Sequence, residues 1–473
     1  MLKKILLTGV AAGSVIVAAS AAHAGGFALR EQSAAGQGSS FAGAAANGAG
    51  LGSMFWNPAV MTDYKGIQTT VGLTGLMPYA NLTNISGTSA GYNNFLAAGA
   101  TSSGDMALDA ILPNTYASWQ LNQNIWLGLS VNAPYGLATK PDSSYVGRNY
   151  GSTTRASSKE VTASVAYKFN EMVSLAAGVR YLDLKARYTT AAATGLTPSN
   201  WGVLGLQGDG AALGYTLGVT FKPMAGTEIG LGYRSEVKTT LKGDFFGGAA
   251  AAASFQNNQS LAAYALNNPI EVGVPLPQMV TLGLKQKASQ NLTLLAGFEW
   301  TQWSVLKSPA VTYRNSGVNP LTQAVWWSPG TRHLGSPVLP FDYKDGWYAS
   351  LGGEYAWDSK LTLRSGLAFE STPIKDASRS TRLPDNDRIW ASIGAGYKLN
   401  EQLSLDFGYT HIFPKSTKVS ILDPSNPNYK ASYAAGQIDK LNADVKAHVD
   451  IISVSLTYRW DDPAPKVANK VTK

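Results

Sequence analysis

Short runs in which apolar and polar side chains alternate recur along almost the whole chain. In Leu361–Phe369, Leu361, Leu363 and Leu367 are apolar, and Arg364 lies among the intervening positions. Successive side chains of a β-strand point to opposite faces, so each run predicts a strand with one apolar and one polar face. After the N-terminus, no run has the length and apolarity of a membrane-spanning helix. The pattern is typical of a closed barrel with lipid outside and water inside.

The connections between these runs fall into two classes, and they predict how many strands there are. Seven long connections lie at about 80–112, 135–155, 189–210, 241–275, 304–340, 371–386 and 415–445. Six short ones are rich in the residues that tight turns favour: Asn122–Asn124, Asn170–Glu171, Pro223–Gly226, Ser289–Asn291, Asp358–Ser359 and Asn400–Gln402. Together they join fourteen strands. Bacterial outer-membrane barrels have short periplasmic turns and long outer loops, so both ends of the barrel sequence should face the periplasm.

The final strand shows which parity faces lipid. Ile452, Val454 and Leu456 should point outward, whereas Ser453 and Ser455 should point inward. Aromatic residues cluster beside the short turns, where an interfacial girdle is expected. A soluble β-sandwich with aromatic edges is the alternative. The sequence favours an all-β fold, a 14-stranded antiparallel transmembrane β-barrel over residues 66–460.

The N-terminal region interrupts the alternation. Residues 1–24 resemble a secretory signal peptide, with Lys3 and Lys4 before an apolar stretch and a small-x-small site at Ala22–Ala24; an N-terminal membrane anchor is the alternative. Residues 25–65 are rich in Gly and Ala, and we expect a plug, or hatch, inside the lumen. A flexible leader is the alternative. However, Asn57-Pro58-Ala59 favours order, since Asn caps helices and Pro suits the first helical position.

Composition excludes several function classes. The net charge of +8 is dispersed, so nucleic acid is not an expected partner. The chain has no Cys and four His, and the spacing of the histidines predicts no metal site. No P-loop or Gly-x-Ser-x-Gly elbow occurs. We therefore expect neither an enzyme, nor a cofactor, nor catalytic residues. Residues 461–473 are polar, and we expect a periplasmic tail.

The long connections predict a place for a ligand. They carry apolar side chains although they should lie outside the cell, and such patches often mark binding sites. The alternative is that the loops pack on one another and cap the barrel. The candidate ligand-binding residues in them are Trp201, Phe245, Phe246, Phe255 and Leu261.

A set of local motifs resembles one known family, the long-chain fatty acid outer-membrane transporters (FadL family). Asn57-Pro58-Ala59 is similar to the plug motif of that family. The other matching segments follow in the family's order over most of the mature chain: Tyr135–Thr139, Tyr233–Lys238, Lys242–Gly243, Trp300–Ser304, Tyr343–Asp345, Leu383–Asp385, Asp387–Arg388 and Trp390.

The resemblance implies passive uptake of hydrophobic compounds across the outer membrane of a Gram-negative bacterium. A ligand would be captured among the outer loops and pass to a deeper pocket. Movement of the hatch, at Asn57, Pro58 and Ala59, would then open an exit near Pro134, beside a kinked third strand. Because the family binds the ligand carboxylate with basic residues, Lys344 is a candidate ligand-binding residue. Alternation supports it, since Trp347, Ala349 and Leu351 should face lipid and Lys344 should then face inward. Arg187 is a second candidate, although alternation places it on the outer face.

The expected partners are a hydrophobic small molecule, a fatty acid or a hydrocarbon, and outer-membrane lipid, and the expected state is a monomer. Two other functions remain open from the sequence: a general porin and an outer-membrane lipid hydrolase.

Overall fold

A computed structural model describes residues 25–88, 99–192, 202–247, 268–314, 317–318, 325–327, 341–421, 430–431 and 438–460. The predicted signal peptide, the predicted tail, and the ligand candidates Trp201, Phe255 and Leu261 lie outside these ranges. Within them, no helix is long and apolar enough to cross a membrane.

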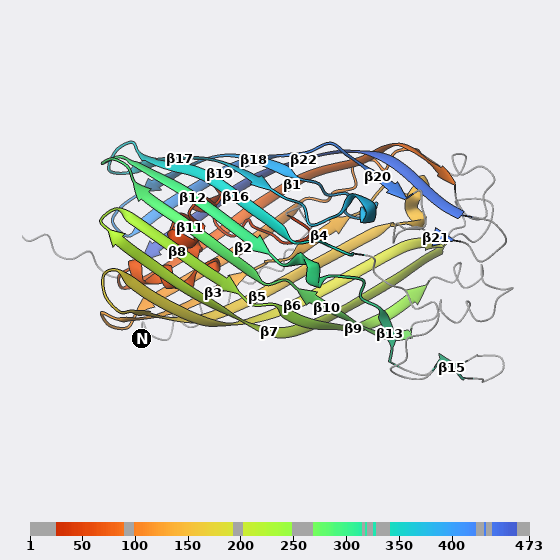
Figure 1. Ribbon diagram of the computed structural model, residues 1–473, viewed down its shortest axis with the longest axis horizontal. Helices are drawn as coiled ribbons and strands as arrows, with labels where there is room; N and C mark the ends of the chain where they lie inside the picture. Colours follow the sequence, from red (N-terminus) through yellow and green to blue (C-terminus); the bar gives the residue numbers. More distant parts are fainter. Residues whose placement is uncertain are drawn as a thin grey trace, which may run out of the picture.

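The described strands form one antiparallel barrel (Figure 1). Its segments are β1 Ile67–Thr88, β2 Ala110–Gln120, β3 Ile125–Asn132, β4 Gly136–Thr139, β5 Thr153–Lys168, β6 Val173–Ala192, β7 Gly202–Met224, β8 Thr227–Arg234, β9 Val237–Gly247, β10 Asn268–Leu276, β11 Met279–Lys287, β12 Leu292–Thr301, β13 Val311–Tyr313, β16 Gly346–Ala356, β17 Leu361–Glu370, β18 Arg388–Lys398, β19 Leu403–Pro414, β20 Thr417–Ile421, β21 Lys430–Ala431 and β22 Ile438–Arg459. β14 (Gly317–Val318) and β15 (Val325–Trp327) pair separately.

Some wall strands are interrupted, so that two consecutive segments make up one strand. Counted in this way, the wall has the fourteen strands that the sequence predicts. For example, β3 and β4 both pair with β5, and β8 and β9 both pair with β7. The barrel closes where β1 pairs with β22 along nearly the full length of both strands. Closure matters because every backbone N–H and C=O group at membrane depth then has a partner within the wall.

The predicted faces and turns are confirmed by the structure. Ile452, Val454 and Leu456 are exposed, whereas Ser453 and Ser455 are buried. All six short turns lie between paired strands, at the left end of the barrel in Figure 1. Several strands extend further into the long connections than alternation indicated; β6, for example, ends at Ala192. Backbone pairing outside the lipid requires no apolar face, so alternation does not mark where such strands end.

The N-terminal segment, residues 25–65, lies inside the barrel (Figure 1) and is almost entirely buried. It consists of short helical turns: α2 (Ala34–Gln37) and the 3-10 helices η1 (Ala44–Ala46), η2 (Gly50–Phe55) and η3 (Pro58–Asp63). The described parts of the long connections contain three more: η5 (Val146–Asn149), η7 (Trp303–Val305) and η8 (Asp376–Ser378). The position and burial of the N-terminal segment fit the expected plug.

Candidate functional site

Asn57 joins the N-terminal segment to the wall. Its side chain accepts a hydrogen bond from the Ala59 backbone N–H (3.0 Å), which caps η3. Its amide nitrogen donates to the backbone carbonyls of Ala45 (2.7 Å) and Val219 in β7 (2.9 Å). Pro58 occupies the first helical position, as its missing N–H and fixed φ predict. The motif that suggested order from the sequence therefore holds two parts of the segment against one strand.

Glycines on the inner wall allow the segment to approach the backbone of the strands. A Cβ atom at Gly230 would lie 1.7 Å from the Ala45 carbonyl oxygen, and one at Gly232 would lie 1.9 Å from that of Trp56. Any larger residue at these positions of β8 would displace the segment. Glycine is abundant on this face because the backbone of the N-terminal segment lies directly against it.

Charged side chains also join the segment to the wall. The Arg30 guanidinium binds both carboxylate oxygens of Glu299 in β12, at 2.7 and 2.9 Å. Arg234 in β8 donates to the Phe55 carbonyl (2.9 Å) and pairs with Glu160. The Glu370 carboxylate accepts a hydrogen bond from the Gly25 backbone N–H (2.8 Å). These inward-facing charges are paired, as buried charges must be.

A break in the wall lies between β3 and β4, and the N-terminal segment fills it. β3 pairs with β2 as far as Val131, after which the chain passes through Pro134 into β4. The Leu29 N–H donates to the Pro134 carbonyl (2.8 Å), and the Gly136 N–H donates to the Phe27 carbonyl (2.9 Å). Proline cannot donate to a strand ladder, so a break is expected there. Phe27–Leu29 thus supply the pairing that β2 does not.

An apolar cavity lies inside the barrel directly beside this break. It has a volume of about 60 Å³. Its lining comes from the N-terminal segment, six strands and the chain before β16: Phe27, Leu137, Ala156, Leu184, Ala186, Tyr188, Leu206, Gln207, Gly208, Leu241, Gly243, Ile270, Val272, Val274 and Phe341. Pockets that enclose whole ligands of drug size measure roughly 300–1,000 Å³. A long ligand would therefore have to displace part of the lining, and Phe27 and Phe341 are the lining residues that do not belong to the wall.

One cation lies beside the cavity without an acidic partner. The Arg382 guanidinium lies over the ring of the cavity residue Tyr188, 5.3 Å from its centroid. It donates to the Thr153 carbonyl (3.2 Å) and the Thr154 hydroxyl (3.1 Å) of β5. Among the described residues, no carboxylate forms an ion pair with it. Burial lowers the pKa of Arg382 to about 10, so the side chain stays charged at neutral pH.

The structure places the predicted ligand residues at different distances from this cavity. Phe245 in β9 is buried in the apolar cluster that surrounds the cavity. Phe246 contacts the Arg187 guanidinium, 4.7 Å from its ring centroid. Arg187 is exposed on the outer face of β6, where alternation places it, and donates to Gln207 (2.9 Å). Lys344 lies before β16, which begins at Gly346, so the alternation that predicted an inward side chain does not extend to it. Its side chain is exposed and follows the buried Tyr343.

Sequence reasoning missed Phe27 and Arg382. Phe27 is an isolated aromatic residue in a Gly-rich segment, and only the fold brings it against the break. Arg382 lies directly before the Leu383–Asp385 motif, which was the available signal. It occupies an irregular connection, where strand parity does not indicate which way a side chain points.

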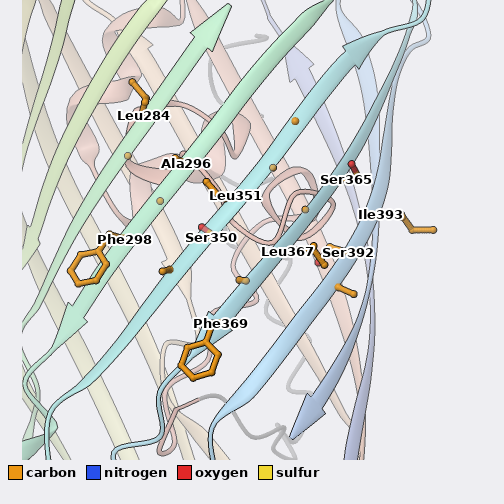
Figure 2. Close-up of a pocket in the computed structure, with 18 of the residues that line it drawn as sticks. Leu284, Ala296, Phe298, Ser350, Leu351, Ser365, Leu367, Phe369, Ser392 and Ile393 are labelled. Atoms are coloured by element: carbon orange, nitrogen blue, oxygen red, sulfur yellow. The ribbon is translucent and has the colours of Figure 1, made fainter. Parts of the chain in front are cut away.

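A large hollow lies on the outside of the wall and not in the lumen (Figure 2). Leu351, Leu367 and Ile393 border it and are more than half exposed. Smaller residues, including Ala296 and Ala349, lie between such large side chains. Because these outward faces contact lipid in a transmembrane barrel, this groove is part of the membrane-facing surface.

No group of three or more His, Cys, Asp or Glu side chains that could hold a metal ion occurs in the described ranges. His411 and Asp450 form the one ion pair of these ranges that contains histidine, and it lies between β19 and β22.

Comparison with known proteins places this architecture in a family. Residues 15–460 match the family model described as "Outer membrane protein transport protein (OMPP1/FadL/TodX)". A long-chain fatty acid transport protein of Shigella flexneri is 26% identical over 457 residues, which cover 89% of this chain and 95% of the relative.

Solved structures share the fold. A Pseudomonas aeruginosa FadL homologue has a TM-score of 0.77 at 22% identity and covers 93% of this chain and 100% of the homologue. The Ralstonia pickettii toluene transporter TbuX has a TM-score of 0.62 at 17% identity, covering 90% and 98%. The family consists of outer-membrane transporters and channels and not of enzymes. With a matching family model over most of its length and a closed fourteen-stranded barrel, this chain belongs to the OMPP1/FadL/TodX family of outer-membrane transport proteins.

Proposed function

We propose that this protein takes up long-chain fatty acids or related hydrophobic acids by diffusion through the barrel. The observation that carries the proposal is the apolar cavity beside the β3–β4 break, with Phe27 common to both. The Phe27 side chain would contact a ligand in the cavity, and the Phe27 backbone fills the β3–β4 break. A general porin is less well supported, because its lumen would be open to water at the level where residues 25–65 are buried.

The energetics of such uptake require no external energy source. Burying a CH₂ group stabilises the bound state by roughly 0.8 kcal/mol, so a long acyl chain gains on the order of 10 kcal/mol. A carboxylate that accompanies the chain needs a cation in an apolar environment. Arg382 supplies one beside the cavity, and no carboxylate in the described part of the chain forms an ion pair with it. Lys344 is the alternative cation that the family resemblance suggests.

Release would follow displacement of Phe27–Leu29 from the break. Their backbone hydrogen bonds to Pro134 and Gly136 close the wall, and Gln32 adds one to the Ala133 carbonyl (3.1 Å). Losing these contacts would leave β4 paired with β5 alone along Gly136–Thr139, apart from one bridge between Ala107 and Thr139. A ligand in the cavity could then leave sideways between β2 and β4, into the membrane.

The role of Arg382 is tested by comparing an acid with a neutral ligand. Hydrogen bonds to charged groups contribute roughly 1.5–3 kcal/mol. Arg382→Met should therefore weaken palmitate binding, measured by calorimetry in detergent, roughly 10- to 150-fold. Binding of a neutral alkane of equal length should not change, and Arg382→Lys should restore part of the loss. Lys344→Met is the matched control. If Lys344→Met lowers palmitate affinity and Arg382→Met does not, the assignment passes to Lys344.

A disulfide tests the release step, and the chain offers a clean background because it has no cysteine. Ala28 and Tyr135 form an antiparallel bridge, flanked by the hydrogen bonds of Leu29 and Gly136. Such non-hydrogen-bonded pairs bring Cα atoms to ~4.5 Å, which a disulfide can span. Oxidised Ala28→Cys/Tyr135→Cys protein should retain ligand binding and lose uptake into cells, and reduction should restore uptake.

A second pair shows whether the whole segment must move. Ser40 and Ser392 in β18 are joined by a 2.7 Å hydrogen bond on another part of the wall. Oxidised Ser40→Cys/Ser392→Cys protein should still transport if only Phe27–Leu29 are displaced. Uptake at the normal rate with the Ala28–Tyr135 link closed would refute the proposed exit.

A further inference from the structure

The outer face of β5 and β6 carries a cluster of cations that the transport path does not use. Arg155 and Lys159 in β5, and Lys185 and Arg187 in β6, are all exposed. Their neighbours Ala156, Leu184 and Ala186 line the internal cavity. Because alternate residues of a strand face opposite sides, the four cations point away from the lumen. We call these four residues the outer basic patch.

The patch places like charges opposite each other. Arg155 is the direct cross-strand partner of Arg187, and like charges in that relation destabilise a sheet. Among the described residues, Arg187 donates one hydrogen bond, to Gln207, and its guanidinium lies over the Phe246 ring. In the described part of β5 and β6, the ion pairs involve Lys168, Arg180 and Glu160, and none of the four cations.

Nearby acids compensate the patch only in part. Asp183 is the cross-strand partner of Lys159, and Asp209 of β7 is that of Lys185. On the part of β5, β6 and β7 that bears the patch, four cations and two acids leave 4 − 2 = +2. An arrangement of like charges face to face, with a net positive charge, is complementary to an anion that binds from outside.

The position of the patch indicates where that anion comes from. Lys159 lies 169 − 159 = 10 residues above Phe169, which is at the periplasmic end of β5. At ~3.3 Å per residue and a tilt of about 40°, the ten residues rise about 25 Å, the height of the apolar band of such barrels. Below the patch the wall is apolar and exposed, with Val161, Val179 and Leu213. The cations thus lie at and above the outer edge of the hydrocarbon region.

We propose that the outer basic patch docks a phosphorylated lipid of the outer leaflet. The apolar wall below it receives the acyl chains, and the cations receive the phosphate groups. Arginine matches phosphate geometry with two donors, and clusters of basic residues at a membrane surface attract anionic headgroups. Arg155 and Lys159 are four residues apart, about 13 Å along the strand, so the patch suits a headgroup with more than one phosphate. This assignment also gives Arg187 a role outside the transport path.

The test uses diphosphoryl lipid A as the probe and the same glycolipid without its phosphates as the comparison. Each cation near a membrane surface contributes roughly fivefold to anionic lipid binding. The variant Arg155→Gln/Lys159→Gln/Lys185→Gln should bind diphosphoryl lipid A at least tenfold more weakly in native mass spectrometry or fluorescence titration. Wild-type protein should bind the phosphate-free glycolipid at least tenfold more weakly than diphosphoryl lipid A. Its affinity for diphosphoryl lipid A should fall as the salt concentration rises.

The matched control removes the same charge from the opposite end of the barrel. Lys287, Lys360 and Lys398 are exposed beside the periplasmic turns, and their triple Gln variant should bind diphosphoryl lipid A within twofold of wild type. Palmitate binding and the gel mobility of the folded barrel should be unchanged in both variants, which separates this proposal from the transport proposal. Equal losses in the two variants would reduce the effect to net charge and overturn the assignment. So would equal affinity for the phosphate-free lipid, or full competition by inorganic phosphate at the same phosphate concentration.

Discussion

Arg30→Met should release the N-terminal segment from the wall. Arg30 forms a bidentate ion pair with Glu299, and its guanidinium carbon lies 3.8 Å from the centroid of the Tyr348 ring. The side chains of Arg30 and Glu299 are 10% and 6% exposed. Methionine keeps much of the packing volume and removes the charge, so the substitution leaves the Glu299 carboxylate buried without a cation.

The magnitude follows from what remains around Glu299. Removing one partner of a buried ion pair costs roughly 3–5 kcal/mol. Here the Thr281 and Thr301 hydroxyls lie 3.4 Å from the carboxylate and compensate weakly, so we expect about 3 kcal/mol, the low end of that range. If this loss of free energy affects the docked state alone, the fraction of molecules in which Phe27–Gln32 has left the wall rises on the order of a hundredfold.

Hydrogen exchange measures this opening directly. The Leu29 and Gln32 amides are hydrogen-bonded in the docked segment and should exchange about a hundredfold faster in the variant. Adding Glu299→Gln should reverse most of the effect, because the buried charge is then gone. Arg180→Met is the control: Arg180 pairs with Glu160 and donates to the Ser235 carbonyl within the wall. Unchanged protection at Leu29 in Arg30→Met would show that the ion pair does not hold the segment.

Three further outcomes follow from the structure. Asn57→Ala removes a cap and two hydrogen bonds to buried carbonyls; it should destabilise docking of the segment by about 2–3 kcal/mol, seen as faster exchange at Ala59. Leu367→Lys puts a charge on the lipid-facing side of β17, where Leu367 is 62% exposed; the free energy of folding into vesicles, measured by urea titration, should fall by roughly 2–4 kcal/mol, whereas the volume-conserving Leu367→Ile should be nearly neutral. Burial raises the pKa of Glu31 to about 7, above its ordinary value, so the docked segment holds the proton more tightly than the free one. Docking should be strongest at low pH and weaken as pH rises through 7; Glu31→Gln should remove this pH dependence of exchange, and its persistence would assign it elsewhere.

The alternation of side chains was enough to predict the wall. Leu361–Phe369 and the last strand show one lipid-facing parity each, and the polar composition of the six short turns sets the strand count and orientation. These features are local: a transmembrane strand must place apolar residues outward at every second position, whatever its neighbours are. The same parity correctly placed Arg187 on the outer face. The Asn57-Pro58-Ala59 motif predicted a capped helical turn for the same reason, because capping involves adjacent residues.

The contents of the lumen depend on the tertiary structure. Parity puts Arg234, Glu299 and Glu370 inside the barrel, but only the closed fold shows that Phe55, Arg30 and Gly25 are their partners. Phe27 lies at the β3–β4 break and Arg382 contacts Tyr188. Both residues belong to irregular segments, in which no repeat indicates where a side chain points. The wall is set by the sequence because lipid imposes the same requirement along each strand, whereas the candidate ligand site depends on the tertiary structure because its residues meet only when the barrel closes.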